Sequence, residues 1–390
     1  MGRGRLAAVS AFTEVGVGSR GAERHAAWAG GLALLFCCCV PALLVVARIV
    51  VSIHLHSFAF DFHNYYWPSG HALLDGRSPF PPPTPDAVSP HGTHMYPAGP
   101  YPAPAVVLFA PFALLPIWLA DVAFTAIVIG SLCFALYLVG VRDWRCYGAV
   151  FLWAPVASGI QTANLTLLLL FGLAVLWRVR ERVVASAVVV GVLVSLKLLL
   201  WPMVVWLLAT RRYAAAAWSL VVAIATTALT WSLVGFAGLH DYPRVGRIFA
   251  EAYERLTYTP FAFFASLGIP SPFARGAGYA IAVTALAAVV FAARRRGSES
   301  SSFALAVGAA LLCAPIAWLH YFALVLVPLA ILSPAFSPVW LLPAILWLCP
   351  VGSPGTPWKF ALPLVVCAAV LVLAPRGQAR SRLMPRPRAA

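Results

Sequence analysis

Long apolar runs recur along nearly the whole chain and constrain its fold more than any other feature. Of the 390 residues, 62% are hydrophobic and 10% are charged, which leaves too little polar surface for a water-soluble protein of this size. We therefore predict an all-α polytopic membrane protein with about 12 transmembrane helices, several of them shorter than the length that a straight span needs. The predicted runs are 28–50, 117–139, 146–160, 164–177, 183–198, 199–210, 213–235, 273–293, 301–318, 320–333, 338–350 and 358–374.

Arginine clusters between the apolar runs predict how the helices are oriented. The net charge is +15, but the arginines form short clusters rather than one basic face, so they indicate membrane topology and not nucleic-acid binding. Placing the clusters in the cytoplasm makes 146–177 and 183–210 tight helical hairpins. Residues 1–25, expected to be disordered, and 376–390 then become cytoplasmic tails around a transmembrane domain over 26–375. We expect a multi-pass protein of the plasma membrane with both termini in the cytoplasm.

Two polar loops are predicted on the extracytoplasmic side. The first, 54–104, is rich in aromatic residues and proline, and the apolar segment 102–114 at its end is expected to dip into the outer leaflet and return. The second loop is 236–272. It is predicted to contain a short surface helix held by ion pairs, because three charged residues fall at helical spacing: Arg247, Glu251 and Arg255.

Asp61 is the outer acidic residue best placed to act as a base. It follows the first apolar run and lies between Phe60 and Phe62. An acid held among aromatic residues at the membrane boundary can have its pKa raised towards that of a working base. A solvated carboxylate at a helix end is the alternative interpretation. Asp121 is instead expected in the first turn of a helix, where a carboxylate suits the helix dipole.

Two other ionisable residues lie in apolar surroundings. His320, between two apolar runs, could bind a phosphate, position a base or hydrogen-bond a carbonyl. The ammonium of Lys197 is surrounded by hydrocarbon, so it should be paired, lie near an anionic ligand or reach the outer interface. Arg244 and Arg247 in the second loop could hold a phosphate or contact lipid headgroups.

The sequence predicts no metal site and no cofactor. All 8 cysteines lie in or beside apolar segments, without a CxxC pair. The histidine pairs His54-x-His56 and His91-x-x-His94 lack a helix-borne acidic partner, so they give only a weak zinc signal. No glycine-rich loop follows a strand, which argues against a soluble nucleotide donor.

A series of short motifs resembles glycosyltransferase family 87 of the GT-C superfamily over most of residues 28 to 374. The motifs are Asp61-Phe62 with Tyr66 and then Leu74-Asp75-Gly76 to Phe80; Tyr101-Pro102 followed by Ala110-Pro111-Phe112 and Leu115-Pro116; Gln161 to Asn164; Gly191 to Lys197 with Pro202; Arg211-Arg212; and Pro315 to Tyr321. Members of this family are multi-spanning enzymes that use polyprenyl-phosphate sugars. The resemblance implies a GT-C type bundle whose extracytoplasmic loops carry the active site.

The same resemblance implies roles for individual residues. Asp61 would be the general base, and His320 and Lys197 would belong to the donor site. Three departures concern acceptor recognition more than the chemistry. Ala103 stands where the family usually has a second proline, Pro68 is expected to interrupt the helix of the first loop, and that loop contains an extra run from Pro79 to Pro90.

The implied reaction is an inverting transfer from a polyprenyl-phosphate sugar to a glycolipid or lipoglycan, with an α-linked product. Mannose is the favoured sugar, and arabinofuranose is the second choice. Lys197, Arg244 and Arg247 are expected to bind the donor phosphate. The expected substrate contacts, several of which could equally be interfacial anchors, are Tyr65, Tyr66, Tyr101, Gln161 and Asn164.

Two other classes of protein stay open from the residues alone. A secondary transporter could use Lys197 and His320 as a proton or solute path. A non-catalytic lipid-binding partner would need neither Asp61 nor His320. Membrane lipids are expected neighbours in every case.

Overall fold

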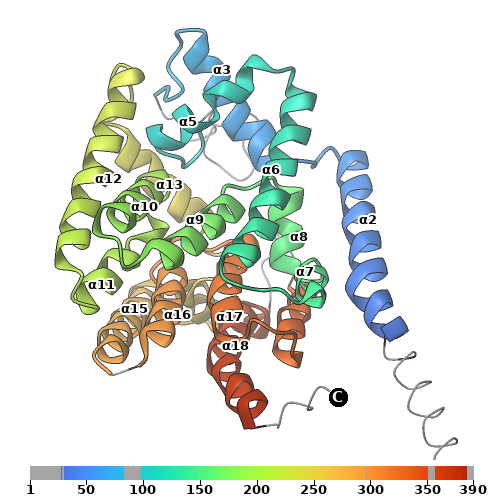
Figure 1. Cartoon of the computed structure of the whole chain (residues 1–390). Coiled ribbons are helices and arrows are strands. Elements are labelled where there is room, and N and C mark those ends of the chain that lie inside the picture. The colour runs from blue at the N-terminus through green and yellow to red at the C-terminus, as the bar shows by residue number, and fades with distance from the viewer. Residues whose placement is uncertain (1–27, 29, 83–97, 296, 350–355, 384–390) are drawn as a thin grey trace, which may run out of the picture.

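The chain is a bundle of helices in the computed structural model, which describes residues 28, 30–82, 98–295, 297–349 and 356–383 (Figure 1). Every regular element among these residues is a helix, which agrees with the predicted all-α class. The tail predicted over 1–25 lies outside the described residues. The C-terminal helix α18 (Pro357–Leu383) continues into the segment predicted to be the other tail.

Five of the described helices are long and apolar enough to cross a membrane. A bent pair, α8 (Ala154–Gln161) with α9 (Thr166–Val179), makes a sixth candidate if it is taken as one span. The predicted number of about 12 spans is therefore not confirmed. The five candidate spans are Gly30–His54, which contains η1 (Leu35–Cys39) and α2 (Val40–His54); α6 (Ile117–Leu138); α12 (Tyr213–Leu233); α15 (Ser271–Ala293); and the segment Pro357–Ala374 of α18.

The other apolar runs form shorter helices. A helix rises about 1.5 Å per residue, so these helices fall short of the roughly 30 Å hydrocarbon core when they stand alone. They are α5 (Ala103–Phe109) with η3 (Ala110–Leu114), α7 (Trp144–Val150), α10 (Val183–Leu196), η4 (Leu198–Leu200) with α11 (Pro202–Ala209), α14 (Pro260–Ser266), α16 (Glu299–Leu312), η5 (Leu319–Val325) with α17 (Leu326–Leu332), and η6 (Pro338–Leu348).

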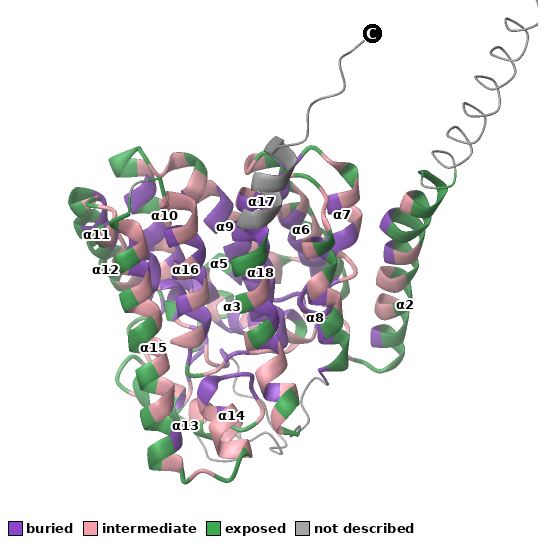
Figure 2. Cartoon of the chain, turned by 90° about the horizontal axis from the view of Figure 1, so that it is seen from below, coloured by how far each residue is buried: buried purple, intermediate pink, exposed green. Residues whose placement is uncertain are grey.

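The centre of the bundle is formed by short helices that the longer ones surround. The η5–α17 segment is almost entirely buried and half of the α9 residues are buried, whereas α2 is largely exposed at one side of the bundle (Figure 2). Helices α10 and α12 pack closely at Gly191, where an added Cβ would lie 2.6 Å from the Cβ of Val222. The exposed apolar side chains of α2, α12 and α15 are suited to lipid contact.

The first polar loop contains helical structure. Residues 60–74 form one helical run that comprises η2 (Phe62–Tyr66), a π-helical turn, and α3 (Trp67–Leu74). The predicted interruption at Pro68 is wrong, because Pro68 lies in the first turn of α3, directly after the π turn. The π turn directly before it changes the hydrogen-bond register, so the run continues past a residue that has no backbone N–H to donate. Residues 83–97, which include the His91-x-x-His94 pair, lie outside the described residues.

Breaks in the apolar helices coincide with the residues singled out from the sequence. The chain turns by 118° between α8 and α9, which makes this pair a broken span or a re-entrant loop. Lys197 has an extended backbone between α10 and η4. His320 lies at the start of η5, after the non-helical segment 313–318. Backbone without regular hydrogen bonding is tolerated at membrane depth only where protein surrounds it or where it lines a cavity.

Two local expectations are corrected by the structure. Asp121 lies in the second turn of α6, which begins at Ile117, and its Oδ2 is 2.8 Å from Nδ1 of His63, so this acid pairs with a side chain rather than with the helix dipole. The second loop does contain a surface helix, α13 (Tyr242–Tyr253). Its expected ion pairs are absent among the described residues: Glu254, just beyond the helix, pairs instead with Arg275.

Candidate active site

Asp61 is fixed to the break between α8 and α9 by its backbone and its side chain. Its backbone N–H donates to the carbonyl oxygen of Thr162 at 2.9 Å, an acceptor that the break leaves outside the α8 hydrogen-bond ladder. Its Oδ2 accepts a hydrogen bond from Nδ2 of Asn164. Asp61 is thus held at a helix end in a defined orientation.

Asn164 is oriented by its own neighbours. Its Oδ1 accepts from the backbone N–H and the hydroxyl of Thr166, at 2.8 and 2.6 Å. This arrangement directs Nδ2 towards Asp61 and also towards the hydroxyl of Tyr101, which is 3.2 Å away. Ala163 has a φ of 46°, a left-handed conformation that non-glycine residues rarely adopt. The strained turn and the Thr166 contacts together present the Asn164 amide to the carboxylate.

Aromatic side chains surround this pair. The hydroxyl of Tyr66 accepts a hydrogen bond from the backbone N–H of Leu165 at 3.2 Å, and the Tyr66 ring stacks on Phe109 with centroids 4.1 Å apart. The rings of Tyr66 and Tyr101 lie edge to face at 4.6 Å. Tyr65 lies at the margin of this group, 6.4 Å from the ring of Tyr101. The carboxylate of Asp61 therefore sits beside a rigid, mostly buried aromatic group.

Lys197 contributes a cation to the same group. Its Nζ lies 3.8 Å from the ring centroid of Tyr321 and 5.5 Å from that of Tyr101. The Nζ atom is buried and has no hydrogen-bond partner within the described part of the chain. Cation–π contacts of this kind stabilise an ammonium, but they do not satisfy its three N–H donors.

His320 contacts the same tyrosine, Tyr321, as Lys197 does. Its imidazole is 4.9 Å from the ring of Tyr321, and its side chain is only 5% exposed. Helix α8 approaches closely, because a Cβ added at Gly159 would lie 3.6 Å from the Cβ of His320. The buried Nε2 also has no hydrogen-bond partner among the described residues.

Burial and charge act in opposite directions on the carboxylate of Asp61. Burial raises the pKa of Asp61 to about 6, although the Asn164 hydrogen bond, the charge of Lys197 and a Thr162 hydrogen bond oppose the rise. A carboxylate in this range can be ionised near neutral pH and still accept a proton, which suits a general base. The influence of Lys197 on Asp61 also indicates that the two groups share one electrostatic environment.

The other residues expected at the site lie outside this group. The amide of Gln161 donates to the hydroxyl of Ser57 at 3.3 Å and holds the end of the first span. Arg244 and Arg247 are exposed on α13. No contact of either guanidinium with Asp61 or Lys197 is seen in the described ranges. Their predicted role in phosphate binding therefore lacks support from geometry.

The described residues also bear on the weak zinc signal. No group of three or more histidine, cysteine, aspartate or glutamate side chains converges within the described ranges to hold a metal ion. The His54-x-His56 pair is described, and it belongs to no such group.

Two residues of the site were not singled out from the sequence. Tyr321, next to His320, contacts the Lys197 ammonium, and Thr166 fixes the Asn164 amide. The Tyr321 side chain had a signal, because an aromatic residue beside a buried histidine often packs against the same ligand space. Thr166 had none, since its role depends on the bend between α8 and α9.

Comparison with known proteins identifies the family of the chain. Residues 100–317 match glycosyltransferase family 87, a range that includes Tyr101, Asn164 and Lys197 but neither Asp61 nor His320. The chain is also 29% identical over 266 residues to a polyprenol-phosphate-mannose-dependent alpha-(1-2)-phosphatidylinositol pentamannoside mannosyltransferase from Mycobacterium tuberculosis. This alignment covers 64% of the present chain and 57% of the relative, so the chain spans little more than half of that protein. No solved structure matches the chain. Because the family match covers more than half of its residues, the chain belongs to glycosyltransferase family 87.

Proposed function

We propose that the chain transfers a sugar from a polyprenyl-phosphate donor to a hydroxyl group of a glycolipid or lipoglycan acceptor, with inversion at the anomeric carbon. The single observation that carries this proposal is the grouping of an oriented carboxylate, Asp61, with two buried and unpartnered nitrogen groups, those of Lys197 and His320. Family membership supports glycosyl transfer, and the name of the Mycobacterium tuberculosis relative supports a polyprenyl-phosphate donor.

Asp61 acts as the base in the proposed reaction. Its carboxylate takes the proton of the acceptor hydroxyl while the acceptor oxygen forms a bond to the anomeric carbon of the sugar. The bond from that carbon to the donor phosphate breaks, and its electron pair leaves with the polyprenyl phosphate. Asn164 acts as a positioning residue, because its hydrogen bond fixes the orientation of the Asp61 carboxylate.

Lys197 stabilises the negative charge of the leaving phosphate. A buried ammonium without a partner is costly in a membrane protein, and a phosphate oxygen would satisfy the N–H donors that Tyr321 and Tyr101 leave free. His320 offers a second donor from its unpartnered Nε2 when that nitrogen is protonated. The ammonium and the imidazole N–H together stabilise the negative charge that develops on the departing polyprenyl phosphate.

Mannose is the proposed sugar and an α-linkage the proposed product, with arabinofuranose as the alternative sugar. The support for mannose is the name of the Mycobacterium tuberculosis relative. Tyr65, Tyr66 and Tyr101 offer aromatic faces and hydroxyls to the substrates. Purified protein supplied in turn with polyprenyl-phosphate mannose and polyprenyl-phosphate arabinose would distinguish the sugars by the mass of the glycolipid product.

The site is proposed to face away from the cytoplasm, with both termini cytoplasmic and the protein in the plasma membrane. Helices α13 and α14 lie at one edge of the bundle and the α11–α12 turn at the opposite edge (Figure 2). That turn carries Arg211 and Arg212, and clustered arginines favour the cytoplasmic side. Labelling of a cysteine introduced at Ser57 or at Arg211, with a reagent that does not cross membranes, tests this orientation.

The decisive experiment replaces Asp61 with asparagine and measures turnover with a polyprenyl-phosphate sugar. We expect Asp61→Asn to lower kcat by about 10²- to 10⁴-fold, the usual contribution of a general base, and to leave the fold intact, since Asn can still accept from Asn164. The matched control is Asp75→Asn, in the same loop but exposed and paired with Arg77 at 2.7 Å; it should keep nearly full activity. Near-normal turnover in Asp61→Asn would remove this residue from the base role, and solute flux in proteoliposomes without a covalent product would indicate a transporter.

A further inference from the structure

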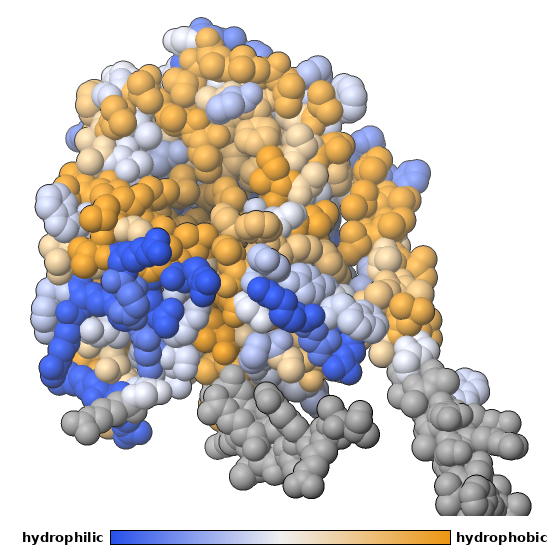
Figure 3. Space-filling view, in the orientation of Figure 1, coloured by the Kyte–Doolittle hydropathy of each residue, from blue (hydrophilic) through white to orange (hydrophobic). Residues whose placement is uncertain are grey.

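A pocket lies between two turns of the bundle, away from the Asp61 site. It is formed by the α11–α12 turn and the α15–α16 turn and has a volume of about 500 Å³, which is within the range of small-ligand sites. The hydrophilic side chains in this part of the molecule gather over α11, α15 and α16 (Figure 3). The charged residues that line it are Arg211, Arg212, Arg294, Arg295 and Glu299.

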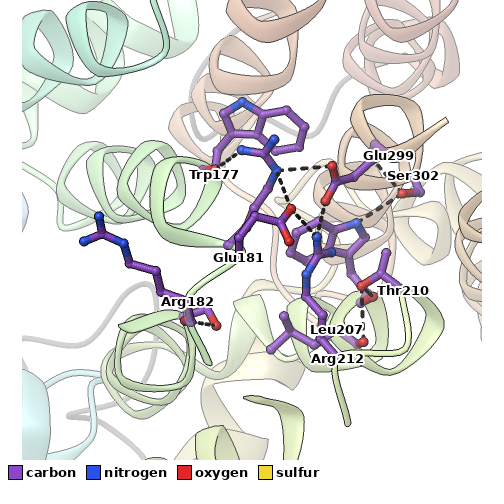
Figure 4. Close-up of polar contacts among 11 residues, drawn as sticks. Trp177, Glu181, Arg182, Leu207, Thr210, Arg212, Glu299 and Ser302 are labelled. Carbon is purple, nitrogen blue, oxygen red and sulfur yellow. Dashed lines mark hydrogen bonds and ion pairs between the residues drawn. The ribbon is translucent and has the colours of Figure 1, made fainter. Parts of the chain in front are cut away.

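The floor of this arginine pocket is a network in which arginine charges are paired with glutamate charges. Nη2 of Arg212 lies 2.6 Å from the Glu181 carboxylate and also contacts Glu299. Nε of Arg180 lies 3.2 Å from the second oxygen of Glu299 (Figure 4). The indole N–H of Trp206 donates to the hydroxyl of Ser302 at 3.1 Å, one turn along α16. These contacts hold the floor together. They occupy Glu299, the acidic residue among the described side chains that line the pocket.

The remaining arginines of the pocket have no carboxylate partner. Neither Arg211 nor Arg294 forms an ion pair with any residue that the structure describes, and Arg295 lies over the ring of Phe291 at 4.4 Å. The lining thus carries more positive than negative charge. Arg211 has a φ of 63°, a left-handed conformation at a helix end where glycine is usual, so the chain presents a large cationic side chain here despite unfavourable backbone geometry.

Two helices add to the positive potential because they begin at the rim. Helix α12 starts at Tyr213 and α16 at Glu299, and the first N–H groups of a helix carry partial positive charge. The pocket therefore combines guanidinium groups with backbone donors, the arrangement that proteins use to bind phosphate.

The position of the pocket relates it to the membrane surface. Two of its elements, α12 and α15, are candidate spans, and the pocket lies where α12 begins and α15 ends. Tyr213 and Phe291 beside it are each 62% exposed, as expected of side chains at the boundary between lipid tails and headgroups. We propose that the arginine pocket binds a phosphate group, which an anionic lipid headgroup can supply from the membrane or a soluble phosphate compound from the aqueous side.

The test compares two variants that remove equal charge. Arg211→Gln/Arg294→Gln removes the unpaired arginines of the pocket and leaves the Arg212 network intact. The control, Arg178→Gln/Arg182→Gln, removes two exposed arginines of the neighbouring α9–α10 region; the Arg182 side chain points away from the Arg212–Glu299 network (Figure 4). Each full-length protein is placed in phosphatidylcholine nanodiscs that contain fluorescent phosphatidylglycerol, and binding is measured by energy transfer from tryptophan.

We expect the pocket variant to bind phosphatidylglycerol about thirtyfold more weakly, from the usual contribution of two basic groups at a membrane surface, and the control to change by less than about threefold. A second arm titrates inorganic phosphate into nanodiscs of phosphatidylcholine alone. If phosphate raises the thermal unfolding midpoint of the wild type but not of the pocket variant, while phosphatidylglycerol binding is equal in all three proteins, the ligand is a soluble phosphate.

Equal binding of phosphatidylglycerol by both variants, without any difference in the phosphate titration, overturns the proposal. An equal loss in both variants overturns it as well, because it would show general attraction to the surface rather than a site. If the double variant does not fold, the single variant Arg294→Gln, which leaves the end of α11 unchanged, gives the same comparison with a smaller effect. The proposal is independent of the sugar transfer, since no residue of the Asp61 site is altered.

Discussion

Two clusters of buried and half-buried charge differ in how their cations are satisfied. Around Asp61, the Nζ of Lys197 and the Nε2 of His320 are buried without a hydrogen-bond partner among the described residues. In the floor of the arginine pocket, Arg212 and Arg180 each form an ion pair with Glu299, although the buried Nε of Arg180 has no aligned hydrogen bond among the described residues. A buried unpaired cation is costly, whereas a paired one is tolerated. The difference indicates that the first cluster is completed by a ligand and that the second is completed by the protein.

The backbone differs between the two clusters in a corresponding way. Asp61, Asn164, Lys197 and His320 all lie at helix breaks or irregular helical turns, where unsatisfied backbone groups and side chains can face a substrate. Glu299 and Arg212 lie instead at the starts of regular helices, α16 and α12. The irregular region is therefore suited to chemistry and the regular region to holding helices together.

After Asp61, the largest expected effect is at Lys197. Lys197→Met keeps much of the apolar stem but removes the ammonium, so kcat should fall by roughly 10²-fold or more, as is usual when a charge-stabilising group is lost. Thermal stability should stay equal or rise, because the buried cation no longer has to be accommodated. Turnover assays and melting curves on the purified protein check both parts.

Lys359→Met is the natural control, since Lys359 is the other lysine of the chain and lies beside Trp358. It should leave turnover unchanged. If Lys197→Met loses stability in proportion to activity, this lysine stabilises the fold and does not bind a ligand. The two clusters would then not differ in the way described above.

A smaller effect is expected at Asn164. The hydrogen bond from its amide lowers the pKa of Asp61 and so counteracts part of the effect of burial. Asn164→Ala should therefore raise that pKa further and leave the carboxylate free to rotate. We expect kcat to fall by about 10-fold at neutral pH, in the range of a lost hydrogen bond to a charged group, and the acid limb of the pH profile to move to higher pH.

The pH profile separates this positioning role from a purely structural one. Gln161→Ala is the matched control, because that amide lies at the same break but bonds to Ser57; its profile should not move. An Asn164→Ala enzyme with lower activity and an unshifted profile would show that the amide does not act through Asp61.

The wild-type enzyme should itself lose activity in acid. A base must be deprotonated to act, and the pKa of Asp61 is raised to about 6. As pH falls below that value, kcat/KM should decline by about tenfold per pH unit, while the plateau lies above it. A plateau that continues unchanged down to pH about 4, the ordinary range of an aspartate, would show that the carboxylate is not buried in the working enzyme.

Hydropathy predicted where the helices break better than it predicted how many spans there are. The positions of Asp61 after the first run and of Lys197 between α10 and η4 follow from where the apolar runs end, because a run ends where the helix does. The runs could not separate full spans from short buried helices, since both are equally apolar. The number of about 12 spans is accordingly not confirmed.

Contacts that depend on three-dimensional bends could not be predicted from the sequence. The Asn164–Asp61 bond requires the 118° turn between α8 and α9 and the left-handed Ala163, and no local pattern encodes either. The helix of Asp121 begins at Ile117, as the apolar run 117–139 predicted, but the carboxylate lies just beyond the first turn. Its pairing with His63 depends on the folded first loop, which no local pattern encodes. The exposed Arg244 and Arg247 show that composition alone does not place a phosphate site.

The smallest expected effect concerns the paired cluster. Glu299→Gln leaves Arg180 and Arg212 without their shared carboxylate. Because the Glu299 side chain is 33% exposed, water compensates in part, and the loss of stability should be about 1 kcal/mol rather than the several kcal/mol of a fully buried pair. The melting temperature in detergent should fall slightly, while turnover per folded molecule stays unchanged.

Glu251→Gln, on the exposed face of α13, provides the control and should change neither. If Glu299→Gln instead lowers turnover as strongly as Lys197→Met, the two clusters are coupled. Arg180 and Arg212 would then contribute to turnover and not only to the stability of the fold.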